Sequence, residues 1–354
     1  MKKVVTAFLA AGLVLGVATP AHAKDVTISG SGSTAVKNLL DVCIPEYQTA
    51  TGNTVNYAGG GSGAGRSALT AGTVDFAFSD AAYSSTEKKP ADFVYVPAVQ
   101  FPVAVFAKLD GFTGKLNLSA KSVAGIFAGK ITKWNDKAIV ADNTVVNPKT
   151  KKKVVAKLPS TDITVWYRSD KSGTTGIFAN WLVKQDPTTW NKPADQTFTT
   201  AFPGTVPAGT FQGGNGSDGV ATGVASKNGS IGYAETSYAT ERKLTIASIQ
   251  NNVGEFVAPS AAATAIFNNG FKAGARGTIT VDPTAKVKGA YTLAGFSYAL
   301  AYGSGKDAAK QAAVKDFLTY VLGTCATKNA VAKGYSPIVG ALNDLAVANI
   351  AEIN

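Results

Sequence analysis

Hydrophobic and polar residues alternate in short blocks that predict strands, and each block leads through a glycine-rich loop into a helix. Residues 25–29 alternate with a period of two, which is typical of a strand. Residues 30–34 read Gly-Ser-Gly-Ser-Thr, and the apolar residues between 36 and 47 then recur with helical spacing. Ser33 or Thr34 is placed to cap this helix. Strand, glycine-rich loop and helix form the repeating unit of the chain.

The same unit recurs further along the chain. Residues 54–57 precede the glycine-rich run 59–65, and the apolar block 74–78 ends in Ser79-Asp80. Much later, 163–167 leads into the loop 168–175 and another helix. This alternation predicts an α/β protein with largely parallel sheets. Ligands of such sheets bind beyond the carboxyl ends of the strands, where these loops lie.

Two longer apolar runs, Val94 to Phe106 and Tyr291 to Tyr302, are long enough to cross between two lobes. This interpretation divides the chain into lobe I, residues 24–102 plus 293–354, and lobe II, residues 103–292. The length of 354 residues suits two ordinary domains.

The N-terminus has the pattern of a secretory signal peptide. Lys2 and Lys3 precede an apolar stretch, 4–17, and Ala21-His22-Ala23 is a small-x-small cleavage site. The stretch is short for a membrane span. We therefore expect residues 1–23 to be removed and the product to be soluble and exported, in the periplasm or beyond it.

The only histidine of the chain is His22, inside the expected signal peptide. Without it, neither a Ser-His or Cys-His nucleophile nor a His-ligated metal site can form. The sequence therefore favours a binding protein over an enzyme, with no metal and no cofactor.

The two cysteines, Cys43 and Cys325, lie far apart in the sequence. An oxidising compartment and an even count favour a disulfide between them. A pair of buried thiols is the other interpretation, because Cys43 lies on an apolar helix face.

Basic residues outnumber acidic ones, 34 to 23, but they do not indicate nucleic-acid binding. The Lys-rich segment 149–153 has no aromatic residues between its lysines, so a solvated hairpin tip is the better interpretation.

The glycine-rich loops share one chemistry, small hydroxyl residues and glycines directly before a helix. Backbone N–H groups and hydroxyls at such a helix start can hold an anion. In the loop 168–175, Arg168 can offer a two-pronged hydrogen bond, Asp170 can hold its guanidinium, and Ser172 and Thr174 can complete a cradle. A surface Arg–Asp pair before a capped helix is the alternative.

Taken together, these motifs resemble the phosphate-binding proteins of ABC-type phosphate importers. The resemblance covers nearly the whole chain after residue 23, and the Tyr167-Arg168 loop also resembles the related DING proteins. It is carried by Gly30-Ser31-Gly32-Ser33-Thr34, Gly61-Ser62-Gly63, Val74 to Asp80, the loop from Arg168 to Thr174, Gly125 to Ile131, Trp134-Asn135-Asp136, Asn215 to Val220, and Ser230 to Tyr233.

The resemblance implies a two-lobed periplasmic binding protein fold of type II, with the ligand in the cleft between the lobes. It implies that phosphate is bound by Thr34, the backbone N–H of Ala35, Ser62, Asp80, Arg168, Ser172, Gly173 and Thr174, with Asp170 in support. Asp80 would accept the hydrogen bond of a protonated phosphate oxygen. Where this chain has Ala35 the family often has a bulky aromatic residue, which predicts a looser pocket wall. Arg66 either adds positive charge near the site or faces solvent.

The implied partners are inorganic phosphate and an inner-membrane ABC permease, and we expect a monomer. Two alternatives remain open. The ligand could be another tetrahedral oxyanion or a small phosphate ester, or the protein could be a DING-like secreted phosphate-binding or phosphatase-type protein.

Overall fold

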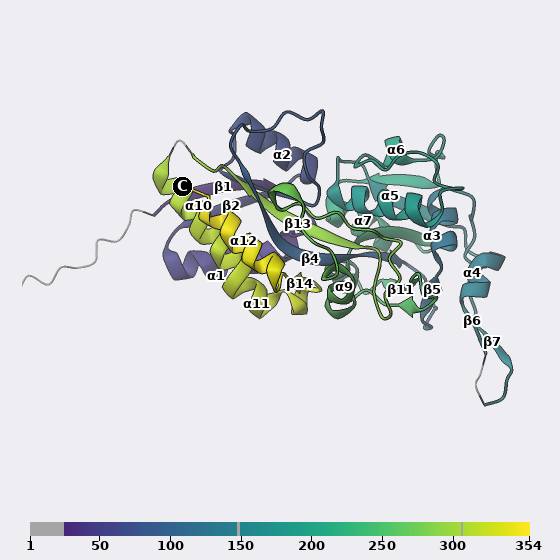
Figure 1. Cartoon of the computed structure of the whole chain (residues 1–354). Helices are drawn as coiled ribbons and strands as arrows, with labels where there is room; N and C mark the ends of the chain where they lie inside the picture. The colour runs from purple at the N-terminus through teal and green to yellow at the C-terminus, as the bar shows by residue number, and fades with distance from the viewer. Residues whose placement is uncertain (1–24, 147–148, 306) are drawn as a thin grey trace, which may run out of the picture.

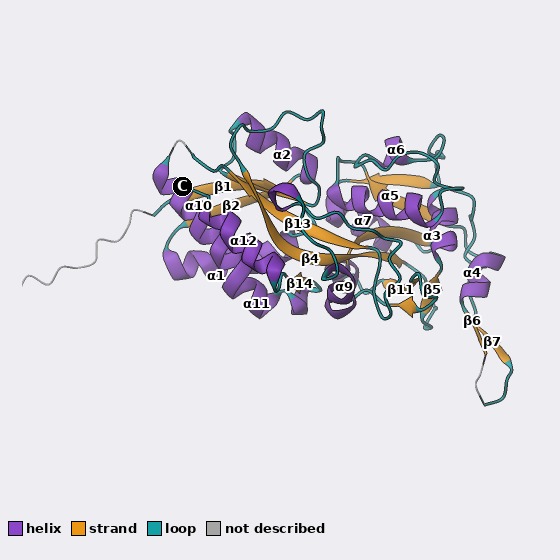
Figure 2. Ribbon diagram, viewed as in Figure 1, coloured by secondary structure: helices purple, strands orange, loops and turns teal. Residues whose placement is uncertain are grey.

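A computed structural model describes residues 25–146, 149–305 and 307–354 (Figure 1). The expected signal peptide, residues 1–23, lies outside the described residues. Helices and strands gather in two groups, one around α1, α2, α10 and α12, the other around α3, α5 and α7 (Figures 1 and 2). The long strand β4 pairs with strands of both groups, and β13 runs beside its residues 94–102.

The main sheet has strand order β2-β1-β3-β13-β4-β10-β8-β9. Strands β1, β2 and β3 run parallel at one side, and β8, β9 and β10 run parallel at the other. The strands are β1 (Thr27–Gly32), β2 (Thr54–Gly59), β3 (Phe76–Ser79), β4 (Val94–Ala107), β5 (Leu116–Leu118), β6 (Thr144–Val146), β7 (Lys153–Val155), β8 (Thr164–Arg168), β9 (Phe211–Gly214), β10 (Ser230–Glu235), β11 (Thr245–Gln250), β12 (Phe256–Val257), β13 (Ala294–Ala301) and β14 (Ser336–Pro337).

Helices cover both faces of this sheet and bury its apolar side chains (Figure 2). They are α1 (Lys37–Thr51), α2 (Ser62–Ala71), α3 (Ala120–Phe127), α4 (Lys137–Asp142), α5 (Gly173–Gln185), α6 (Phe198–Ala201), α7 (Gly216–Ser226), α8 (Thr236–Glu241), α9 (Ala261–Asn268), α10 (Ala308–Tyr320), α11 (Ala326–Asn329) and α12 (Ala341–Ala351). Short 3-10 or π turns lie at Ala275–Gly277, Val321–Cys325 and Val331–Lys333.

Strand β4 belongs to both halves of the molecule. Its residues 94–102 pair with β13, whereas 103–107 pair with β10, both antiparallel. All 14 residues of β4 are buried, which is why this strand reads as a continuous apolar run instead of an alternating one. The two predicted crossing runs therefore coincide with β4 and β13, paired side by side.

The start of α1 differs from the prediction. The helix begins at Lys37, and its N-cap is Val36, which makes no side-chain capping bond. Instead, the Ser33 hydroxyl accepts a hydrogen bond from the Ala35 N–H and donates one to the Asp80 carboxylate. The prediction that Ser33 or Thr34 caps the helix is wrong because Ser33 turns inward to a carboxylate distant in sequence.

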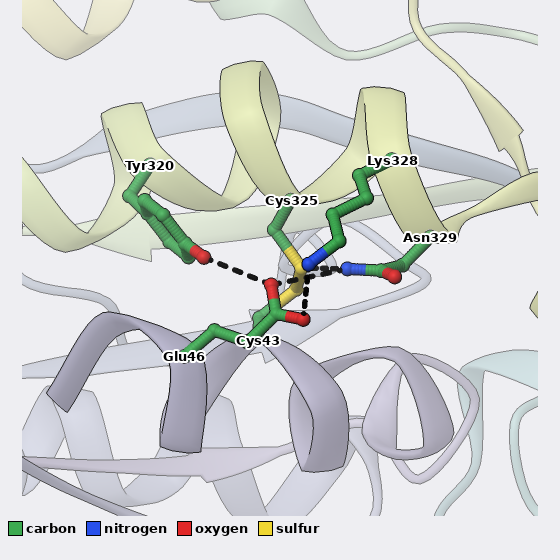
Figure 3. The surroundings of a disulfide bond; sticks show 6 residues. All are labelled: Cys43, Glu46, Tyr320, Cys325, Lys328 and Asn329. Atoms are coloured by element: carbon green, nitrogen blue, oxygen red, sulfur yellow. Dashed lines mark hydrogen bonds and ion pairs between the residues drawn. A yellow bond between two sulfur atoms is a disulfide. The ribbon is translucent and has the colours of Figure 1, made fainter. Parts of the chain in front are cut away.

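Cys43 and Cys325 form a disulfide that ties α1 to the π turn after α10 (Figure 3). Beside it, the Glu46 carboxylate accepts hydrogen bonds from Lys328, Tyr320 and Asn329 (Figure 3). Of the two interpretations that the sequence left open, the structure has the disulfide. It links the N-terminal part of the chain to the C-terminal part.

The Lys-rich segment connects β6 and β7, which pair antiparallel as a hairpin extending away from the body of the molecule (Figure 1). Its described residues 149–153 are exposed, as the prediction of a solvated hairpin tip requires. Within the described ranges, no helix is long and apolar enough to cross a membrane.

Candidate functional site

The carboxyl ends of five strands meet at one place between the two halves of the molecule. Arg168 and Glu235 are the last residues of β8 and β10, whereas Thr34, Asp80 and Ser217 come shortly after β1, β3 and β9. The carboxyl ends of strands in an α/β sheet are where ligands bind. The sheet topology therefore explains why residues more than two hundred positions apart share one site.

Asp80 lies at the centre of the hydroxyl groups. It is 7% exposed, and its carboxylate accepts hydrogen bonds from Ser33 Oγ at 2.6 Å and Ser62 Oγ at 3.2 Å. Thr174 Oγ1 lies 3.5 Å from Asp80 Oδ2. Burial raises the pKa of Asp80 above its ordinary value, although the Ser33 hydroxyl and the Arg168 charge oppose this shift. The hydroxyls around Asp80 favour its ionised, accepting form.

Arg168 supplies the cation. Its Nε and Nη2 donate to the two oxygens of Asp170 at 2.7 and 2.5 Å, and its Nη1 donates to Ser217 Oγ at 3.2 Å. The Gly216 N–H also donates to Asp170 Oδ1, which holds the carboxylate in place. Although burial acts against it, the Arg168 hydrogen bonds and charge lower the pKa of Asp170. The guanidinium is therefore fixed in orientation and largely balanced in charge.

The start of α5 supplies backbone donors. Ser172 is its N-cap, and its hydroxyl accepts a hydrogen bond from the Thr175 N–H at 3.1 Å. A Cβ on Gly173 would lie 2.6 Å from Ser62 Oγ and 2.7 Å from Asp80 Cβ, so only glycine fits there. The expected residues Ser172, Gly173 and Thr174 thus all lie at the site, with the Ser172 hydroxyl engaged in capping.

The two halves of the molecule touch across the site. Thr34 Oγ1 lies 3.1 Å from Ser217 Oγ and accepts a hydrogen bond from the Ser217 N–H. The Gly63 N–H donates to the Lys171 carbonyl, and the Tyr238 hydroxyl donates to the Thr34 carbonyl. Ala35 is fully buried beside them. The residues expected at the site are therefore brought together, with the two halves in direct contact.

Arg66 does not face solvent; it is 1% exposed. Its guanidinium donates to Ser79, to Glu87 at 2.9 Å and to Gln196 at 2.8 Å, and Lys171 donates to the same Glu87 oxygen at 2.8 Å. Burial acts against it, but the hydrogen bonds from Arg66 and Lys171 lower the pKa of Glu87 to about 2. We call Arg66, Glu87, Lys171 and Gln196 the clasp, because it connects the two halves beside the site.

Sequence reasoning missed Ser217 and Glu235 as site residues. A local sequence pattern could have identified Ser217, because Asn215-Gly216-Ser217 is another glycine and hydroxyl segment between a strand and a helix. The local sequence gives little indication that Glu235 belongs to the site, since it is a single carboxylate at the end of a fully buried strand. Its place near Arg168 and Thr174 depends on the pairing of β10 with β8 and β4.

A cavity of about 610 Å³ adjoins the site on the side of β13. Its lining residues include Asp80, Gly173, Ile177, Trp181 and Tyr298. The cavity is bounded by both halves of the molecule, so relative movement of the halves would change its size.

Comparison with known proteins assigns the chain to a family. Residues 18–324 match the PBP superfamily domain model. The chain is 35% identical over 299 residues to the phosphate-binding protein PstS of Xylella fastidiosa strain Temecula1, covering 84% of this chain and 78% of that protein. The chain belongs to the PstS family. The Haemophilus influenzae PstS protein is 37% identical over 248 residues, 70% of this chain and 69% of that protein.

Solved structures of PstS-like proteins share the fold. A high-affinity periplasmic phosphate-binding protein (PfluDING), solved with phosphate bound, superposes with a TM-score of 0.72 at 25% identity, covering 91% of this chain and 93% of that one. A DING protein superposes with a TM-score of 0.65 at 24% identity, covering 92% and 93% of the two chains. The mixed α/β periplasmic binding protein fold expected from the sequence is confirmed. PstS proteins are binding components of transporters and not enzymes.

Proposed function

We propose that this protein captures inorganic phosphate between its two lobes and delivers it to an ABC permease. One observation carries the ligand assignment: the buried Asp80 carboxylate, which accepts hydrogen bonds from Ser33 and Ser62, places an acceptor in the anion site. An acceptor in an anion site suits a ligand that brings its own proton. Hydrogen phosphate carries such a proton near neutral pH, whereas sulfate does not.

The remaining site residues suit the aprotic oxygens of the ligand. Thr34, Ser62 and Thr174 carry hydroxyls, Gly173 and Thr174 offer backbone N–H groups, and Arg168 offers its guanidinium. The Ala35 N–H, the Ser62 hydroxyl and the Thr174 hydroxyl donate to Ser33, Asp80 and Glu235 in this structure, so they would turn from these partners to the ligand. Because Asp170 already pairs with Arg168, the ligand charge is balanced mainly by neutral dipoles and by the start of α5. Dipoles fixed in place before binding hold an anion at little cost of reorganisation.

We propose that lobe I, residues 24–102 plus 293–354, and lobe II, residues 103–292, move as rigid bodies about β4 and β13. Site groups from the two lobes converge only when the lobes meet, so phosphate shifts the protein toward the closed form. The PstS relationship supports the phosphate ligand, and the periplasmic phosphate-binding protein of the same fold supports a periplasmic location. Delivery to an inner-membrane permease by a monomer is part of the same proposal.

The experiment that tests this function is equilibrium dialysis against radiolabelled phosphate. The protein is first unfolded, dialysed and refolded so that no carried-over ligand remains. One saturable phosphate per chain is expected, and the loaded protein should stimulate ATP hydrolysis by its permease in vesicles. A protein without saturable phosphate binding would overturn the proposal. Equal competition by sulfate would instead indicate the alternative of a general oxyanion site.

A further inference from the structure

We propose that Glu235 is a second acidic group of the anion site and holds a proton together with the bound ligand. In this account, closure around hydrogen phosphate takes up one proton from solution, and that proton lies between the Glu235 carboxyl and a phosphate oxygen. The inference rests on the proposed function and specifies how the site handles ligand charge.

The geometry points to Glu235 first. It is 1% exposed, and its Oε1 lies 2.9 Å from Thr174 Oγ1, a hydroxyl that is also 3.5 Å from Asp80. Its other oxygen, Oε2, is buried and has no hydrogen-bond partner among the described residues. A buried carboxyl oxygen without a partner is unfavourable, so a ligand that shares a proton with it would relieve that cost.

Charged and titratable groups surround Glu235 on several elements. They are Asp80 after β3, Arg168 at the end of β8, Tyr238 in α8 and Tyr335 before β14. Burial raises the pKa of Glu235, the Ser217 hydroxyl opposes the shift, the Asp80 charge adds to it, and the Arg168 charge opposes it. Because Asp170 already pairs with Arg168, a single cation faces three carboxylates here before any ligand enters.

Adding a phosphate dianion to this arrangement places more negative charge beside two carboxylates. Coulomb repulsion at such short range is large unless one group is neutralised. Asp80 and Tyr335 belong to the proposed lobe I and Glu235 to lobe II, so opening the lobes returns water to Glu235 and lets it ionise. In the open form Glu235 is ionised and the ligand is the hydrogen phosphate dianion. Closure then takes one proton from the buffer, and Glu235 and the phosphate share that proton in the closed complex.

Proton linkage tests this inference. Calorimetric titration of ligand-free protein with phosphate, at about pH 8.5 in two buffers of unlike ionisation enthalpy, counts the protons taken up. Few other groups should exchange protons at this pH, because the chain's only histidine is in the expected signal peptide. We expect about one proton per phosphate, and an apparent Kd that rises about tenfold per pH unit above that pH.

The variant Glu235→Gln should bind phosphate with almost no proton uptake and a nearly flat pH dependence. The matched control is Glu241→Gln, an exposed acid-to-amide change in the helix that follows Glu235, which should behave as the parent protein does. Circular dichroism confirms that both variants fold.

Phosphate binding without proton uptake in the parent protein would overturn this inference while leaving the proposed function intact, and it requires no variant. Full proton uptake in a folded Glu235→Gln protein would also overturn it, since the proton would then belong to another group such as Asp80. Absence of phosphate binding in the parent protein would overturn the proposed function, and this inference with it.

Discussion

The Asp170 carboxylate accepts two hydrogen bonds from the Arg168 guanidinium, at 2.7 Å from Nε and 2.5 Å from Nη2. This pair leaves Nη1 as the guanidinium nitrogen that faces Ser217 and the rest of the site. The pairing orients the cation before the ligand arrives, so the Arg168 side chain loses little conformational entropy when the ligand binds.

Replacing Arg168 should weaken phosphate binding strongly. We expect Arg168→Ala to cost about 3 kcal/mol or more, because it removes a charge-assisted donor and leaves the partly buried Asp170 without its cation. Arg168→Lys should restore only part of this loss, since an ammonium cannot bridge two oxygens in one plane. Lys133→Ala, which removes a cation from an exposed pair with Asp162, is the control. Near-normal phosphate affinity in Arg168→Ala would contradict the site assignment.

Removing the charge of Glu87 should open the clasp and speed phosphate release. Glu87 accepts hydrogen bonds from Arg66 on its own side and from Lys171 across the site. Loss of these charge-assisted bonds in Glu87→Gln should cost about 1.5 kcal/mol in the closed form, or roughly tenfold in the release rate. Stopped-flow release of phosphate to a scavenger measures this, with Glu241→Gln as the control. An unchanged release rate would show that the clasp does not hold the lobes together.

The clasp also predicts an acid dependence of stability. The pKa of Glu87 in the folded protein is lowered from 4.5 to about 2, so its ionised form stabilises the folded state above its ordinary pKa. This contribution is lost as the pH falls toward the folded value. The difference in unfolding free energy between the parent protein and Glu87→Gln should therefore be constant above about pH 5 and shrink from there toward about pH 2. A difference that does not change over this range would contradict the prediction.

Loss of the disulfide should affect stability more than binding. The bond between Cys43 and Cys325 closes a loop of 282 residues, and removing such a constraint costs about 3 to 5 kcal/mol of unfolding free energy. The bond ties α1 to the π turn after α10, and among the described residues its side-chain hydrogen-bond partner is Asn329, not a site residue. Phosphate affinity at room temperature should therefore stay within about twofold of the parent value. Urea unfolding and a phosphate titration of the double variant Cys43→Ala, Cys325→Ala check both expectations. A large loss of affinity would mean that the bond positions the site.

The sequence predicted the strands and loops of the site well because their signals are local. Glycine and hydroxyl residues between a strand and a helix identify the loops at Thr34, Ser62 and Ser172, and β4 and β13 appear as long apolar runs. The start of α1 was mispredicted because Ser33 bonds to Asp80, 47 residues away.

The environments of Arg66 and Glu235 could not be derived from their neighbours in the sequence. Arg66 lies on a short helix that would suit an exposed arginine, but Glu87 and Gln196 approach it through the tertiary fold. Glu235 becomes a site residue only because β10 pairs with both β8 and β4. Contacts of this kind depend on strand order, which local patterns do not specify.

Asp80 should determine the preference for a protonated ligand. In Asp80→Asn the amide oxygen can still accept a hydrogen bond from phosphate, but repulsion of sulfate is relieved. We expect phosphate affinity to change little and sulfate affinity to rise, so that the ratio of phosphate to sulfate affinity falls by at least about tenfold. Because burial raises the pKa of Asp80, sulfate affinity of the parent protein should increase as the pH falls. Calorimetry with both anions measures these effects, and an unchanged gap in Asp80→Asn would assign the selectivity to other residues.

We infer that the site selects phosphate because its buried acceptor requires a protonated ligand. Its most direct test is a calorimetric titration of the ligand-free parent protein with phosphate and with sulfate, near neutral pH and at one ionic strength. A site built around a required hydrogen bond rejects an analogue lacking it by roughly four to five orders of magnitude. We expect one tightly bound phosphate per chain and a sulfate affinity that is lower by about that factor. Equal affinity for the two anions would contradict it.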